Sequence, residues 1–183
     1  MKKSVIVLFV IAVTLTACST HDKLVERIRG MEKEISADKS GKVMKEKSAE
    51  IVRLYESFAN RYPEDTLAPA FLFSAGVVTM NSGQPDKAIE MFSRVSEKYP
   101  KHKRAAEACF FTGFIYENTK GNVEKARDAY LDVVKKYPES DLVDDANFCI
   151  QNLGKTPEQV QKQLEENIKR VEDSIAATQQ AKK

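Results

Sequence analysis

The chain has 183 residues, with 29 Lys and Arg against 27 Asp and Glu, and 42% of its residues are hydrophobic. This length suits one domain that buries an adequate core. The near balance of charge argues against nucleic acid as a partner, because the phosphate backbone demands a concentrated positive surface.

Residues 1–17 have the three parts of an export signal. Lys2 and Lys3 supply the positive start, an apolar run follows over residues 5–17, and a small residue, Ala17, ends the segment. At ~1.5 Å rise per residue a run of this length covers only about 20 Å, which is too short for a hydrocarbon core of ~30 Å. We therefore expect a removable signal peptide rather than a spanning helix. Its removal takes away two lysines and leaves the mature chain formally neutral.

The segment Leu15-Thr16-Ala17-Cys18 resembles the bacterial lipobox, in which the cysteine becomes the first mature residue. The alternative is an ordinary secretory signal with an incidental cysteine. The resemblance implies that Cys18 carries lipid, and two or more acyl chains hold a protein stably on a bilayer. Residues 18–21 would then be a lipidated tether. Ser19 resembles the default for delivery to an outer membrane, on its periplasmic face, whereas a single-membrane bacterium would place the domain on the cell surface.

Residues 22–61 predict a degenerate pair of helices. A first apolar stripe with helical spacing is followed by a turn at residues 36–41 and by a second stripe. The first stripe consists of Leu24, Ile28, Met31 and Ile35, and the second of Met44, Ile51, Tyr55, Phe58 and Tyr62.

The dipeptide Tyr-Pro then recurs at residues 62–63, 99–100 and 137–138, so its interval is nearly constant. Gly76 and Gly113 each lie at the same distance in sequence beyond the proline that opens their unit. A turn sequence interrupts each unit in the middle, and Ala88 and Ala126 follow it at the start of a second helix. Self-similarity at such a period is typical of stacked supersecondary units.

These units resemble the tetratricopeptide repeat, a helix–turn–helix of about 34 residues. The glycines and alanines allow close helix contact, and the proline ends the second helix. The resemblance implies an all-α, helical-hairpin solenoid over residues 62–153, with the pair at 22–61 in the place of a first repeat.

Residues 154–183 predict a long C-terminal capping helix and a frayed tail. Thr156, Pro157 and Gln159 form a helix start with a capping box. We expect the apolar stripe of this helix to cover the open end of the stack; it comprises Val160, Leu164, Ile168, Val171 and Ile175.

By the same resemblance, the first helix of each repeat lines a concave, protein-binding groove. The residues that this implies are Phe73, Val77, Met80, Glu107, Phe110, Phe114 and Glu117, with Asp145, Phe148 and Asn152 in a weaker third unit. Aromatic and methionine side chains on a partly exposed surface are typical of a protein interface. The alternatives are that the phenylalanines pack against neighbouring helices or the C-terminal helix, and that the two glutamates are solvated charges.

The sequence offers little for catalysis, so we expect no enzyme, metal or cofactor. Its two histidines, His21 and His102, have no metal-ligand spacing, and no phosphate loop, nucleophile elbow or zinc-protease motif occurs. Cys149 lies two positions farther past its proline, Pro138, than Cys109 lies past Pro100. This offset of about 200° around a helix predicts separate core residues rather than a disulfide.

The combination of lipobox and repeats resembles the lipoprotein family of the outer-membrane β-barrel assembly machine and the periplasmic Tol–Pal coordinator family. The resemblance implies a lipid-anchored envelope scaffold that binds envelope proteins or peptides, in outer-membrane assembly or envelope maintenance. The alternative is an envelope lipoprotein that binds a small ligand or a glycan in the same groove.

Overall fold

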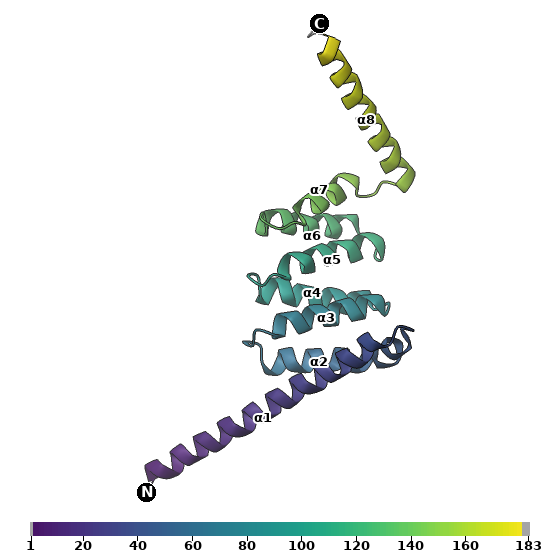
Figure 1. Cartoon of the computed structure of the whole chain (residues 1–183). Helices are drawn as coiled ribbons and strands as arrows, with labels where there is room; N and C mark the ends of the chain where they lie inside the picture. Colours follow the sequence, from purple (N-terminus) through teal and green to yellow (C-terminus); the bar gives the residue numbers. More distant parts are fainter. Residues whose placement is uncertain (1, 181–183) are drawn as a thin grey trace.

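The computed structural model describes the backbone of residues 2–180 and the side chains of residues 20–179. This part of the chain forms α-helices and no strand, and successive helices stack on one another (Figure 1). The predicted all-α solenoid of helical hairpins is thus confirmed. The helices are α1 (Lys2–Ala37), α2 (Lys42–Arg61), α3 (Ala68–Asn81), α4 (Pro85–Lys98), α5 (Ala105–Asn118), α6 (Val123–Lys136), α7 (Val143–Asn152) and α8 (Pro157–Gln180).

From α1 to α7, each helix packs chiefly against its neighbours in the chain. One apolar cluster runs from α1 into α5 and includes Ile28, Phe58 and Phe92, which are fully buried. A smaller cluster surrounds Tyr130 in α6 and draws on α5 and α7. The core therefore follows the stack, as in other solenoids, and thins toward the C-terminal end.

Two glycines let the helices of each hairpin approach closely. A Cβ atom at Gly76 would lie 2.6 Å from the Phe92 ring, and one at Gly113 would lie 2.7 Å from the Tyr130 ring. Ala88 and Ala126, on the second helices, are fully buried. The expected role of these small residues is confirmed.

The three Tyr-Pro turns share one conformation. Tyr62, Tyr99 and Tyr137 follow α2, α4 and α6 with φ of −129°, −128° and −131°, and the proline after each prevents the helix from continuing. The Tyr99 hydroxyl donates a hydrogen bond to the Pro63 carbonyl oxygen at 2.9 Å, which joins the first turn to the second. The repeat seen in the sequence is therefore a repeat in geometry.

The backbone of the amino-terminal segment is helical, and the lipidated tether at residues 18–21 stays a prediction. Residues 18–21 belong to α1, which continues without a break to Ala37. Farther along this helix, Val25, Ile28 and Met31 belong to the main cluster. Cys18 lies outside the residues whose side chains are described. No helix in the described part of the chain is long and apolar enough to cross a membrane.

α8 begins as predicted but does not cap the stack. The Thr156 amide donates to the Gln159 side-chain oxygen at 2.8 Å, and the Gln159 amide donates to the Thr156 hydroxyl at 3.3 Å, which completes the capping box. Beyond this start the helix extends away from α7 (Figure 1). Its apolar residues join neither core cluster, so the expectation that they cover the open end is wrong.

Candidate interaction surface

The predicted groove residues come from the first helices of two hairpins. α3 supplies Phe73, Val77 and Met80, and α5 supplies the other four predicted residues, Glu107, Phe110, Phe114 and Glu117. Burial distinguishes one residue on each helix, because Phe73 in α3 is buried and Phe114 in α5 is exposed, whereas the other five are partly buried.

The α3 residues are part of the core. Phe73 is only 6% exposed, and its ring centroid lies 5.4 Å from that of Phe92 and 5.9 Å from that of Phe111. The Arg104 guanidinium covers the same ring at 4.9 Å. Val77 and Met80 pack against the main cluster. Phe73 is therefore a packing residue, and α3 offers no exposed ring to a partner.

In α5, three of the four predicted residues are held by other side chains. Phe110 packs against Tyr130, with ring centroids 5.3 Å apart. Glu117 accepts a hydrogen bond from the Tyr130 hydroxyl at 2.8 Å. Glu107 binds Arg104 through both carboxylate oxygens at 2.6 and 2.7 Å. These residues are half-buried, so their first role is to hold α5 in place.

Phe114 is the predicted ring that remains open, with 42% of its surface exposed. Phe148 in α7, from the weaker third unit, is 53% exposed. Both helices pack against α6. We name Phe114 and Phe148 the ring pair; they are the exposed rings among the predicted groove residues.

Each ring of the pair stands one turn from an acidic side chain. Asp145 precedes Phe148 by three residues and is exposed, and Glu117 follows Phe114 by three residues. Residues three apart on a helix lie on the same face. Asn118 and Asn152 also bond the carbonyl oxygens of Phe114 and Phe148, at 3.1 and 2.8 Å. Each exposed ring thus has one acidic residue on its own helix face, and we name Asp145 and Glu117 the acidic margin.

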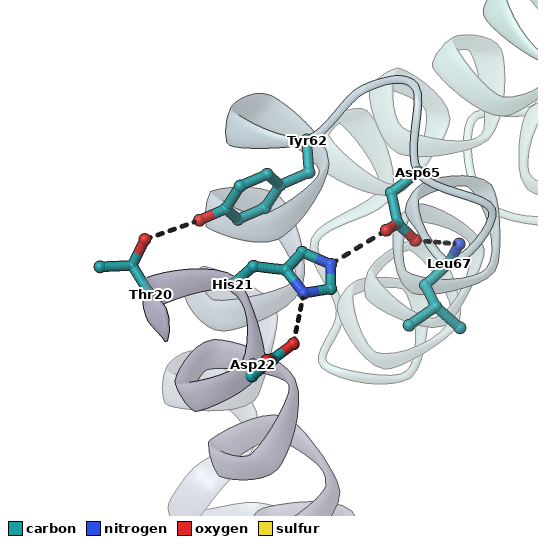
Figure 2. A network of polar contacts seen from close by, with 6 residues as sticks. All are labelled: Thr20, His21, Asp22, Tyr62, Asp65 and Leu67. Atoms are coloured by element: carbon teal, nitrogen blue, oxygen red, sulfur yellow. Dashed lines mark hydrogen bonds and ion pairs between the residues drawn. The ribbon is translucent and has the colours of Figure 1, made fainter. Parts of the chain in front are cut away.

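A polar network fixes the start of α1 to the stack (Figure 2). His21 lies between two carboxylates, with Nδ1 3.0 Å from Asp22 and Nε2 2.9 Å from Asp65 in the turn after α2. Thr20 bonds the Tyr62 hydroxyl at 3.2 Å. Hydrogen bonds to Asp22 and Asp65 raise the pKa of His21 above its ordinary value, against a smaller opposing effect of burial. Sequence reasoning missed this network, because Asp65 is 44 residues away from His21.

The described residues show no arrangement for metal chemistry: among them no group of three or more His, Cys, Asp or Glu side chains is placed to hold a metal ion. Cys109 and Cys149 are free thiols, and burial raises the pKa of both. A thiol with a raised pKa is a poorer nucleophile at neutral pH, because less thiolate is present.

The clefts that the structure describes lie along α1, between α2 and α3, and at the Tyr-Pro turns. One cleft of about 450 Å³ lies between the turns at residues 100–103 and 137–141, and one of about 430 Å³ lies one repeat earlier. Both are open to solvent. These two clefts are therefore not enclosed cavities of the kind that the small-ligand alternative requires.

Comparison with known proteins agrees with this geometry. Residues 71–102 and 112–140 match the family model described as Tetratricopeptide repeat. These segments correspond to α3–α4 and α5–α6, the two hairpins that carry Gly76 and Gly113. No curated protein matches the chain. The chain therefore carries two tetratricopeptide repeats, which are generally non-catalytic modules that mediate protein–protein binding.

Proposed function

We propose that this protein is a lipid-anchored adaptor of the cell envelope that binds other proteins through the ring pair. The observation that carries the proposal is the combination of two tetratricopeptide repeats with two exposed rings, Phe114 and Phe148, near one end of the stack. Exposed aromatic residues on such a scaffold favour protein binding, because aromatic side chains supply much of the energy at interfaces.

The acidic margin suggests the chemistry of the partner. Asp145 and Glu117 flank the ring pair, so a segment with an apolar side chain next to Lys or Arg would be complementary. The partner in this proposal is an envelope protein or peptide, in outer-membrane assembly or envelope maintenance. The support for the envelope is the lipobox-like sequence that ends at Cys18.

The proposed anchor places the protein at the outer membrane on its periplasmic face. The position of Ser19 after Cys18 supports this choice. Metabolic labelling with a radioactive fatty acid tests the anchor directly: the wild type should incorporate label and Cys18→Ala should not. Equal incorporation by both proteins, or none by the wild type, contradicts the anchor.

Site-specific photo-crosslinking in cells tests the binding surface. A photoreactive phenylalanine at position 114 should give a discrete crosslinked product, identified by mass spectrometry, and Asp145→Lys should weaken it. The matched control places the probe at Met44, which is also partly exposed, at 37%, but lies in α2. The same products from both positions, or none from position 114, would rule out the ring pair as the interface.

A further inference from the structure

α8 carries an apolar stripe that the rest of the described chain does not cover. Leu164, Ile168, Val171 and Ile175 are each between 52% and 59% exposed, and none of them joins a core cluster. Burial of each of these large aliphatic side chains would be favourable, because it removes apolar surface from water. An apolar surface would therefore bind this stripe favourably.

The spacing of the stripe identifies the form of that partner. The four residues are 4, 3 and 4 positions apart, which is the alternation of a heptad repeat. Leu164 and Val171 occupy position d, and Ile168 and Ile175 occupy position a. Ile168 and Ile175 at position a, together with Leu164 at the first d position, favour a two-stranded parallel coiled coil, and Val171 fills the second d position.

We propose that α8 pairs with α8 of a second copy of this chain in a parallel, two-stranded coiled coil. The a and d positions present the same apolar row from each copy, so the surface is complementary to itself. In a symmetric pair the same patch on both copies forms the interface, which is the usual arrangement of homodimers.

The flanking charges select the parallel orientation. The e positions hold Glu165 and Glu172, whereas the g positions Asn167 and Ser174 are neutral. In a parallel pair, position g faces position e of the partner, so each glutamate meets a neutral side chain. In an antiparallel pair, e faces e, which would place glutamates opposite one another. Like charges at these positions disfavour pairing.

Two lysines of α8 have an acidic residue one turn further along the same helix. Lys162 lies four residues before Glu166, and Lys169 lies four residues before Asp173. Pairs at this spacing are neighbours on the helix surface, and the Gln161 amide already donates to Glu165 at 3.0 Å. α8 holds five acidic and three basic residues, so two copies pair most readily where the glutamates at position e meet the neutral side chains at position g.

Sedimentation equilibrium of the full chain, extracted in a density-matched detergent, tests the pairing. Over about two decades of concentration up to about 100 µM, the mass should rise from one chain toward two. Ile168→Asp places a charge in the seam and should leave one chain throughout. Ala177→Asp adds the same charge at an exposed position outside the seam and should still dimerise. Circular dichroism checks that both variants keep their helices.

A second substitution tests the orientation. Asn167→Lys places a cation opposite Glu172 of the second copy in a parallel pair, and should tighten the dimer by about threefold, since exposed pairs of this kind each contribute a few tenths of a kcal/mol. In an antiparallel pair the same lysine faces a g position and no tightening is expected.

Four outcomes overturn the proposal. They are a single chain at every concentration, a dimer that survives Ile168→Asp, a mass of three or more chains, and an Asn167→Lys dimer no tighter than the wild type. The labelling and crosslinking experiments above do not depend on this result, so the proposed function and the proposed dimer can fail separately.

Discussion

Gly76 and Gly113 show how single residues set the spacing of the helices. Both sit inside a first helix, where glycine costs about 1 kcal/mol relative to alanine. The structure accounts for this cost, because the Phe92 and Tyr130 rings occupy the space of the missing Cβ atoms. Their recurrence at one fixed position after the proline of each unit made this contact predictable from the sequence alone.

Replacing Gly76 tests this contact. Gly76→Ala should lower the free energy of unfolding by about 1–2 kcal/mol, because the overlap with the buried Phe92 ring outweighs the gain in helix propensity. Gly30→Ala is the matched control, since nothing lies within 4 Å of a Cβ atom at Gly30 in α1. It should stabilise the protein by about 0.5–1 kcal/mol. Urea denaturation checks both signs, and stabilisation by Gly76→Ala would contradict the close contact.

His21 makes the stability of the amino-terminal junction depend on pH. Its pKa in the folded protein is raised by hydrogen bonds to Asp22 and Asp65, so its contribution is complete below the unfolded pKa of about 6.5 and is lost as pH rises through the folded pKa. His21→Gln should therefore destabilise the protein more at about pH 5.5 than at about pH 8.

His102 is the control of opposite sign for the same experiment. Burial, helped by the nearby Lys103 and Arg104, lowers its pKa, so His102 opposes folding increasingly as pH falls. His102→Gln should be relatively more favourable at the acidic end. Thermal unfolding of both variants across this range provides the comparison, and parallel pH profiles for the two would contradict the assignment.

At the scale of a helix, α5 presents two different faces. Phe110 packs against Tyr130, whereas Phe114, one turn later, is substantially exposed. Phe110→Ala should cost about 2 kcal/mol of stability, and Phe114→Ala should change it by less than about 1 kcal/mol. Urea denaturation measures both. A large loss from Phe114→Ala would mean that this ring belongs to the core and is unavailable to a partner.

Helix positions were easier to predict than helix surroundings. The apolar period and the Tyr-Pro turns located the helices of the stack, since both depend on residues close in sequence. The sequence left open whether Phe73 is exposed or packed, because Phe111 and Arg104, which close over it, belong to the next hairpin. The stripe of α8 indicated that an apolar contact is needed, but an amphipathic pattern does not identify the surface that satisfies it.

At the scale of the whole molecule, stability should come from contacts between consecutive helices. α8 contributes little to them, because its apolar residues join neither cluster. Removing residues 154–183 should leave the thermal unfolding midpoint of the dilute, monomeric protein within about 2 °C. Differential scanning calorimetry at low concentration checks this. A large fall would show that α8 supports the stack after all.

The continuity of α1 has a mechanical consequence if Cys18 is lipidated as proposed. Cys18 and His21 are three residues apart in one helix, a rise of about 5 Å. Because His21 is hydrogen-bonded to Asp65, the stack would have little freedom to move relative to its attachment point. The stack would be held close to the bilayer surface, and its tilt relative to the membrane would be restricted. A ligand approaching the ring pair would meet it at a constrained height and angle, and the membrane itself would help to decide which proteins can dock.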